Sequence, residues 1–210
     1  MRRRFTAVRT AAPNDRWWAD GPGVRSFEYR LPADIHDEPW EMRRGLGSSF
    51  GYNRAESTEH LLTPDGLGAL LTEVVAKGGH LLLSVGPDAR GAIPPEHADV
   101  LRLAGTWVRA HQSLVDRGAP WHTWGDGAAR YIVLDGGLHA VDVGGHGKFD
   151  ALARSAGRVV AVTRVDADGT ERRVEFEQDD RGLRLALRSR HLSGHDAVAV
   201  RTAVYRIELV

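Results

Sequence analysis

The sequence contains no cysteine, which excludes disulfide bonds and every metal site that depends on a thiolate. It also has no excess of charge, because Lys and Arg number 28 and Asp and Glu number 28. This balance provides no basic field, so we expect no nucleic-acid partner. No uninterrupted apolar run is long enough to span a bilayer, so we expect no membrane partner either.

An apolar segment of signal-peptide length is missing after the basic start MRRRFTAVRTAAP. We therefore expect a cytoplasmic location for the chain as written, and a secreted or periplasmic one if a leader precedes Met1. The sequence contains no internal repeat of about 20–50 residues, so we expect neither a solenoid nor a propeller fold. The 210 residues suffice for one large domain or two small ones.

The middle of the chain predicts a helix, a buried strand and a second helix. Thr63 is an expected N-cap before Pro64, apolar residues follow at helical spacing, and Gly78-Gly79 ends the pattern. The apolar run 80–87 predicts a buried parallel strand, and 94–96 opens the second helix. This order is typical of an α/β unit, in which a barrel and an open sheet have the same pattern.

After about residue 112 the pattern changes to short alternating segments separated by Gly or Asp turns. They predict an antiparallel β-sandwich of the usual size for such domains. The predicted strands cover 130–135, 138–143, 158–165, 172–178, 183–188 and 198–209. We therefore divide the chain into residues 1–115 and 116–210.

The ten histidines do not predict a metal centre, and no cofactor is expected. His139 with His146, or His191 with His195, could be drawn as ligand pairs, but no carboxylate-flanked set accompanies them. The glycines of DVGGHGKF lack the spacing of a phosphate-binding loop between a strand and a helix.

Four ordered segments of residues 14–110 resemble the later half of a family 29 α-L-fucosidase: NDRW (14–17), FEY (27–29), PWEMRRGLGSSFGYN (39–53) and VVAKGGHLLLSVGPDARGAIP (74–94). The resemblance implies an α/β plus all-β fold, the C-terminal portion of a TIM-type (β/α)8 barrel followed by a β-sandwich. It implies retaining hydrolysis of a terminal α-L-fucose, with a fucosylated glycan or small fucoside as partner and a homo-oligomer as a candidate form of the full-length enzyme.

The resemblance also assigns roles to individual residues. Glu28 matches the general acid/base, and Glu41 is the alternative for that role. Arg16 and Trp17 match a segment that binds the sugar, and Phe50 matches an aromatic that covers the methyl group of fucose. An aromatic setting such as Phe27-Glu28-Tyr29 would favour a protonated carboxyl by desolvation. Considered without the resemblance, Arg16 would be an ion-paired structural residue and Glu28 a surface carboxylate.

The sequence also departs from the family. The nucleophilic aspartate of these enzymes lies upstream of the segment that NDRW matches, and no aspartate occurs among residues 1–13. His80 and Ser84 stand where relatives carry asparagines. We therefore expect an N-terminally truncated chain that is inactive alone, unless Asp20 or Asp37 takes over as nucleophile.

Two alternative functions follow from the same residues. The first is a non-catalytic carbohydrate-binding module, in which the sandwich and exposed tryptophans form the platform; the candidates are Trp17, Trp18, Trp121 and Trp124. The second is a structural remnant of a fucosidase without a ligand.

Overall fold

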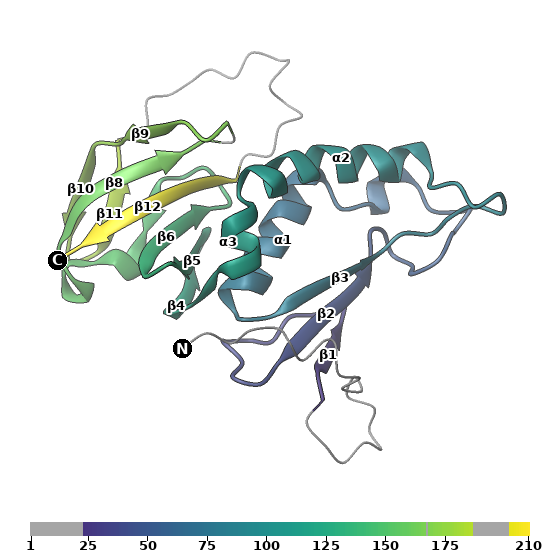
Figure 1. Ribbon diagram of the computed structural model, residues 1–210, viewed down its shortest axis with the longest axis horizontal. Helices are drawn as coiled ribbons and strands as arrows, with labels where there is room; N and C mark the ends of the chain where they lie inside the picture. Colours follow the sequence, from purple (N-terminus) through teal and green to yellow (C-terminus); the bar gives the residue numbers. More distant parts are fainter. Residues whose placement is uncertain (1–22, 167, 187–201) are drawn as a thin grey trace.

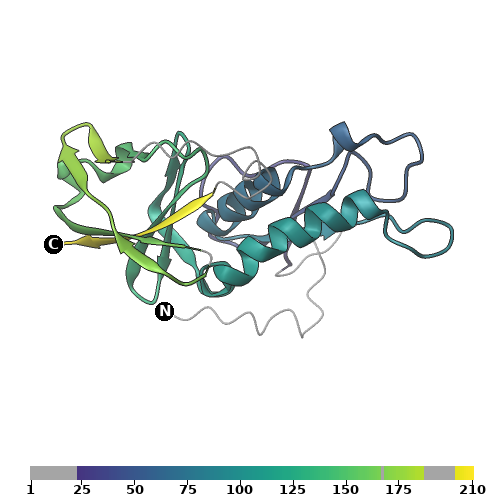
Figure 2. The same ribbon diagram turned by 90° about the horizontal axis from the view of Figure 1, so that it is seen from above.

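The computed structural model describes residues 23–166, 168–186 and 202–210. It contains a three-stranded parallel sheet, a layer of helices and two antiparallel sheets, as Figure 1 shows. In Figure 1, α1 lies between the sandwich and the parallel sheet, and α2 runs above the parallel sheet; Figure 2 shows the two helices side by side. The coarse prediction of an α/β part followed by an all-β part is therefore confirmed.

The parallel sheet has the order β1-β2-β3, formed by Arg25–Glu28, Trp40–Gly45 and His80–Ser84. Side chains alternate between the two faces of a strand. Trp40 and Met42 are buried with Phe27 against Val74 of α1, so one face packs on the helices. The opposite face carries the polar side chains described below.

The first helix, α1 (Pro64–Ala76), begins where the sequence predicted. The Thr63 hydroxyl accepts a hydrogen bond from the Gly66 amide at 3.0 Å, Pro64 follows, and Gly78 has a φ of +80° beyond the last turn. The second helix, α2 (Pro95–Ala110), and the short α3 (Gln112–Arg117) complete the layer. None of the described helices is long and apolar enough to cross a membrane.

The sandwich pairs a six-stranded sheet, β4-β5-β6-β12-β8-β9, with a three-stranded sheet, β10-β11-β7. Short 3-10 turns occur at η2 (Thr58–His60), η3 (Asp150–Leu152) and η4 (Arg154–Ala156). The strands are β4 (Ala119–Asp126), β5 (Ala129–Leu134), β6 (Gly137–Asp142), β7 (Lys148–Phe149), β8 (Val159–Val165), β9 (Glu171–Arg173), β10 (Phe176–Asp179), β11 (Gly182–Leu185) and β12 (Ala203–Leu209).

Each face of the six-stranded sheet packs over part of its area on another layer. One face packs on the smaller sheet, where Tyr131 and Tyr205 meet Phe149. The other face packs on the helices through a cluster that includes Val75, Ala76, Trp107, Leu114, Ile132, Val141 and Val204. The Trp107 indole also donates a hydrogen bond to the Thr202 carbonyl at 3.0 Å. The sandwich and the helical layer therefore share one core.

Several elements differ from the sequence prediction. Segment 172–178 is divided between β9 and β10, because the chain leaves one sheet and enters the other there. Strands β4 and β7 were not predicted. Residues 1–60, whose sequence is typical of strand ends and long loops, contain β1 and β2 in their described part. Helix α3 straddles the predicted division between residues 115 and 116, which stays a prediction.

Gly79 is required by the packing of Trp40, and its replacement is expected to destabilise the protein. A Cβ at position 79 would lie 2.2 Å from Cε2 of Trp40, whose side chain is fully buried and donates to the Lys77 carbonyl at 3.1 Å. We expect Gly79→Ala to cost about 1–3 kcal/mol of unfolding free energy, as overpacking usually does. Urea unfolding followed by Trp fluorescence measures the loss.

Gly51→Ala is the matched control, since a Cβ there meets nothing within 4 Å. An unfolding midpoint shifted equally by both substitutions would contradict the steric explanation.

Candidate active site at the carboxyl edge of the parallel sheet

The face of the parallel sheet that turns away from the helices is polar. Residues paired across neighbouring strands lie on the same face, and Ser26 pairs with Glu41 while Glu28 pairs with Arg43. On β3, His80 pairs with Glu41 and Leu82 with Arg43. The residues on this face are Ser26, Glu28, Glu41, Arg43, His80, Leu82 and Ser84.

Glu28 is the last residue of β1 and lies at the carboxyl edge of this face. Its side chain is 55% exposed, and Oε2 lies 3.6 Å from a guanidinium nitrogen of Arg43. This geometry leaves the carboxyl group reachable by a bound molecule. The Arg43 guanidinium can stabilise the negative charge of the Glu28 carboxylate.

Glu41 lies on the same face but two positions before Arg43, toward the amino end of β2. Its Oε1 is buried and has no hydrogen-bond partner among the described residues, as is also true of Arg43 Nε. A buried polar atom without a partner is costly, so this part of the face carries unsatisfied polar groups. Glu28 is the more accessible of the two candidate acids.

Aromatic side chains also lie at the carboxyl edge, where Tyr29 follows Glu28 in the chain and contacts Phe50. Tyr29 has a φ of +52°, and its hydroxyl accepts a hydrogen bond from the Gly45 amide at 3.0 Å. The Phe50 ring meets the Tyr29 ring edge-on, with 5.2 Å between centroids. Tyr29 and Phe50 are each 38% exposed and Tyr52 is 49% exposed. Partly exposed aromatic rings at this edge of the sheet are suited to packing against a sugar.

The loop 45–53 that carries Phe50 packs closely on its neighbours. A Cβ at Gly45 would lie 1.9 Å from the Ser49 carbonyl oxygen, and a Cβ at Gly86 would lie 2.2 Å from the Tyr52 amide nitrogen. Gly45 and Gly86 therefore allow the loop to fold back over the ends of β2 and β3.

The structure brings Glu28 and Phe50 to one edge and places Glu41 deeper on the same face. Arg16 and Trp17 lie outside the described residues, so their assignments stay predictions. Phe27 points to the helical face, where it is 7% exposed, and therefore does not enclose Glu28. Consecutive strand residues face opposite sides, which is why the expected Phe27-Glu28-Tyr29 enclosure does not form.

Sequence reasoning gave no role to Arg43, although it is the ion-pair partner of Glu28. The period-two pattern of WEMRRG was the available signal, because it places Glu41 and Arg43 on one face. The signal was weak, since only the register of β1 against β2 brings Glu28 opposite Arg43.

The two described tryptophans of the alternative binding platform, Trp121 and Trp124, contact other side chains of the protein. Trp121 packs on His122 and Tyr131, at centroid distances of 3.7 and 5.3 Å. Lys77 Nζ lies 3.8 Å from the Trp124 ring centroid, and Arg130 also covers that ring. Both rings are thus partly buried and already in contact with side chains of the protein. In the described part of the chain, no three His, Asp or Glu side chains gather in a way that could hold a metal ion.

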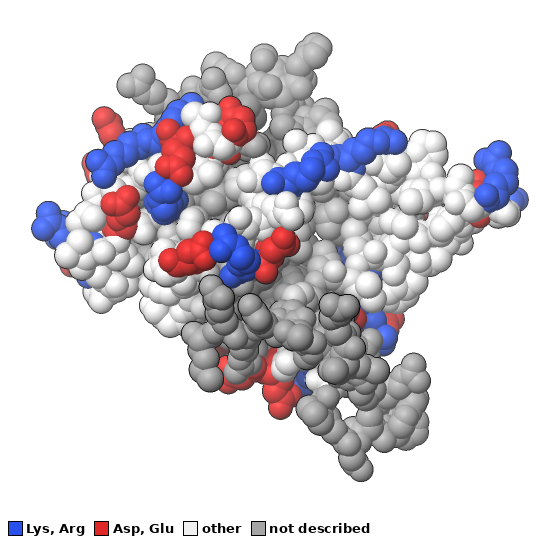
Figure 3. Space-filling model, in the orientation of Figure 1, with Lys and Arg blue, Asp and Glu red and all other residues white. Residues whose placement is uncertain are grey.

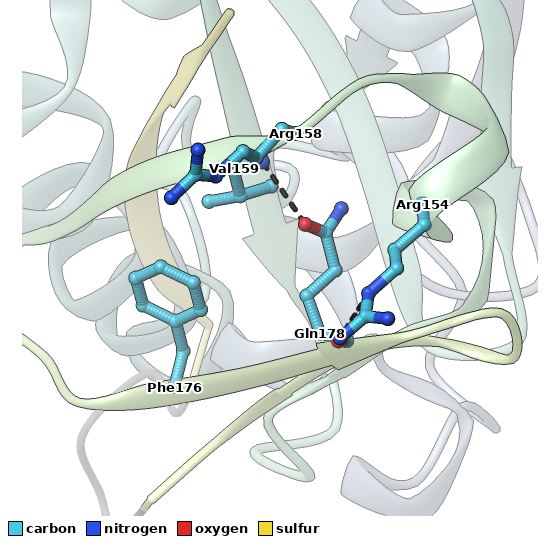
Figure 4. Close-up of a pocket in the computed structure, with 5 residues that line it drawn as sticks. All are labelled: Arg154, Arg158, Val159, Phe176 and Gln178. Atoms are coloured by element: carbon cyan, nitrogen blue, oxygen red, sulfur yellow. Dashed lines mark hydrogen bonds between the residues drawn. The ribbon is translucent and has the colours of Figure 1, made fainter.

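A separate hollow of about 430 Å³ lies on the sandwich, between η4, β8 and β10. Figure 4 shows its lining residues, Arg154, Arg158, Val159, Phe176 and Gln178. The Gln178 amide is satisfied internally, since it donates to two carbonyls and accepts from the Val159 amide at 3.0 Å. No carboxyl group lines this hollow, so it is not the candidate active site.

The distribution of charge on the surface is mixed. On the face that Figure 3 shows, acidic and basic side chains of the described residues stand next to each other over the sandwich. Several charged side chains of the sandwich form ion pairs, including Arg206 with Glu171 and Arg172 with Asp166. This face therefore has no broad field of one sign.

Comparison with known proteins identifies relatives of one kind. The family model described as "Alpha-L-fucosidase" matches residues 1–113. An α-L-fucosidase of Dictyostelium discoideum is 31% identical over 117 residues, which are 53% of this chain and 25% of that protein. The plasma α-L-fucosidase of Rattus norvegicus is 31% identical over 123 residues, 56% of this chain and 27% of that protein.

Solved structures extend the similarity into the sandwich. A structure described as α-L-fucosidase has 29% identity and a TM-score of 0.74, covering 93% of this chain and 45% of that chain. The Thermotoga maritima α-fucosidase with a mechanism-based inhibitor has 30% identity and a TM-score of 0.71, with the same coverage. Its complex with fucose has 30% identity and a TM-score of 0.69. The chain thus spans less than half of these solved chains and about a quarter of the curated relatives.

Proposed function

Because this chain belongs to the α-L-fucosidase family and matches the C-terminal part of those enzymes, we propose that it carries the acid/base half of a retaining α-L-fucosidase site. In this proposal β1, β2 and β3 are later strands of a (β/α)8 barrel, and α1 and α2 belong to its outer ring. The substrate is a terminal α-L-fucose of a glycan or small fucoside. Barrel enzymes hold their sites at the carboxyl ends of the strands, which is where Glu28 lies.

One observation carries the proposal: an accessible carboxyl group and an exposed aromatic surface occur together at the carboxyl edge of a parallel sheet. Glu28 and Tyr29 are consecutive, and Tyr29 contacts Phe50. In a barrel, the helix-covered face is the outer wall and the opposite face points inward. The polar face with Glu28, Arg43 and Glu41 would therefore line the interior.

Glu28 has two tasks in a retaining reaction. It first gives its proton to the glycosidic oxygen as the bond to the anomeric carbon breaks, and it then removes a proton from the water that hydrolyses the glycosyl-enzyme. Between these steps Glu28 is a carboxylate, and Arg43 at 3.6 Å can stabilise it. Phe50 and Tyr29 present apolar ring surface, which suits the methyl group of fucose.

The strands of the parallel sheet do not supply the nucleophile. A retaining enzyme needs a second carboxyl about 5–5.5 Å from the first. The strands β1, β2 and β3 contain no aspartate, and Asp37 precedes β2, at the amino end of the sheet rather than the carboxyl edge. We therefore propose that hydrolysis requires the earlier barrel strands with their aspartate, and that residues 1–210 alone are inactive.

A chimera tests this function directly. The part of the Thermotoga maritima enzyme that precedes its match to this chain would be fused to residues 1–210, and 4-nitrophenyl α-L-fucoside would be the substrate. We expect hydrolysis by the chimera and none above background by the chain alone. Proton NMR should detect α-L-fucose as the first product, because two inversions at the anomeric carbon retain its configuration.

Two outcomes would contradict the proposal. A chimera that unfolds cooperatively yet does not hydrolyse the fucoside would reject the catalytic assignment. Robust hydrolysis by the isolated chain would show that one of its own carboxylates acts as the nucleophile.

A further inference from the structure

Glu56 stands out because its carboxylate is buried without a basic side chain at hydrogen-bond distance. The side chain is only 5% exposed, and its nearest ionisable partner is His97 of α2, whose Nε2 lies 3.9 Å from Oε2. Buried carboxylates are costly unless hydrogen bonds compensate for the lost water. The position of this group therefore calls for a structural reason.

The loop 45–53 supplies that reason. The Ser48 amide donates a hydrogen bond of 2.6 Å to Glu56 Oε1. At Gly47, a Cβ would lie 2.4 Å from Cδ and from both carboxylate oxygens, so the carboxylate lies directly against the backbone there. Glu56 thus contacts the loop at two successive residues, just before Phe50.

Other attachments hold the loop on either side of Ser48, including the Phe50 ring on Tyr29, but they do not involve the Ser48 amide. Leu46 is held by backbone hydrogen bonds to Ser84 and Leu62, both of 2.9 Å. The Tyr29 hydroxyl contacts the Gly47 carbonyl at 3.4 Å, a long hydrogen bond. Among the described residues, the Ser48 amide donates only to Glu56, and that hydrogen bond is short.

Glu56 and His97 are themselves fixed. The Glu56 amide donates to the Asn53 carbonyl at 3.1 Å, which closes a tight turn after the loop. His97 lies in the first turn of α2 and is 8% exposed. The carboxylate therefore connects the loop to the helical layer.

We propose that Glu56 is a positioning residue that holds loop 45–53, and with it Phe50, over the carboxyl edge of the parallel sheet. The link to fucose binding rests on the function proposed above. The positioning of the loop does not, because it follows from contacts within residues 45–97.

Amide hydrogen exchange of the full 210-residue chain tests the positioning without any activity. In Glu56→Ala we expect the Ser48 amide to exchange about 10–100-fold faster, the loss of a hydrogen bond to a charged group. In Glu56→Gln the side-chain carbonyl still accepts, so the acceleration should be only a few-fold. Amides of β12 should keep their rates in both variants, which separates a local effect from global destabilisation.

Glu59→Gln is the matched control, since Glu59 lies three residues away in η2 and is exposed. We expect its exchange pattern to equal that of the wild type. The proposal is overturned if Ser48 exchanges in Glu56→Ala at the control rate, or if β12 accelerates as much as the loop does.

The same variants in the active chimera test the link to the sugar. Misplacing Phe50 removes contacts made in both the ground state and the transition state, so Glu56→Ala should raise KM about tenfold while kcat changes less. A variant that merely folded less well would lose apparent kcat at an unchanged KM, and that result would overturn the link. An inactive wild-type chimera would reject the proposed function, while the exchange result would still decide the positioning.

Discussion

In the active chimera, Glu28→Gln is expected to lower kcat for a fucoside with a poor leaving group by about 10²–10⁴-fold, the usual contribution of a general acid. Glutamine keeps the size of the side chain but cannot give a proton to the glycosidic oxygen. Because Glu28 is exposed and makes one long ion pair, at 3.6 Å to Arg43, we expect little change in stability. Steady-state kinetics and urea unfolding of the same preparation separate the two effects.

The leaving group provides a sharper criterion. The dinitrophenolate of a 2,4-dinitrophenyl fucoside leaves without protonation. The rate of the first step in Glu28→Gln should therefore be close to that of the wild type, and a burst of dinitrophenolate should precede slow hydrolysis of the glycosyl-enzyme. Added azide should accelerate the second step, because this anion needs no general base. If Glu28→Gln lowered the rate of hydrolysis equally for every leaving group, Glu28 would have a role in binding instead of proton transfer.

Glu41→Gln is the comparison that decides between the two candidate acids. Glu41 lies deeper on the same face, two residues before Arg43, so its replacement should affect kcat much less than that of Glu28. If Glu41→Gln lowered kcat more than Glu28→Gln, and did so only for poor leaving groups, Glu41 would be the acid/base.

Glu73→Ala is expected to cause the largest loss of stability outside the hydrophobic core, about 3 kcal/mol. The Glu73 carboxylate accepts from Lys77 Nζ at 2.7 Å and from Arg130 at 2.8 and 3.1 Å. The Lys77 side chain is only 4% exposed, so removal of Glu73 leaves a buried ammonium group without its carboxylate partner. Since Arg130 is on β5 and Glu73 on α1, the network joins the helices to the sandwich.

The pH dependence of this contribution has a definite sign. Burial raises the pKa of the Glu73 carboxyl, but hydrogen bonds and positive charge from Lys77 and Arg130 outweigh it and leave the pKa below its ordinary value of 4.5. The stabilisation is therefore complete above that value and is lost as the pH falls through the lower folded-state pKa. The free-energy difference between wild type and Glu73→Ala should be constant near neutral pH and shrink in acid.

Glu171→Ala serves as the control for this network. Glu171 bonds both terminal nitrogens of Arg206, at 2.7 and 2.8 Å, but the two side chains are 46% and 38% exposed. Solvent screens such a pair, so its loss should cost several times less than the loss of Glu73. Equal losses in the two variants would contradict the role assigned to burial.

The sequence was sufficient for elements with a strong local signal. Thr63, Pro64 and Gly78 mark the two ends of α1 by capping chemistry that acts within a few residues. The alternation of 158–165 corresponds to β8, at Val159–Val165. Strand β4 was missed because its apolar residues do not alternate regularly, and β7 because two residues carry no period.

The candidate site was less accessible to sequence reasoning, because it depends on pairing between strands. The resemblance pointed to Glu28 and Phe50, but their neighbours follow from register and loop packing. Arg43 reaches Glu28 through the β1–β2 register, and Glu56 reaches Ser48 only because Gly47 admits the carboxylate. Neither relation has a local signature in the chain.

The apolar contact between the six-stranded sheet and the helices has a consequence for how the chain can be divided. A fragment that held the sandwich alone would expose Ile132, Val141 and Val204 to water, and one without the sandwich would uncover Trp107 and Val75. Exposed apolar patches of this kind promote aggregation. We therefore expect neither fragment to be as soluble as residues 1–210.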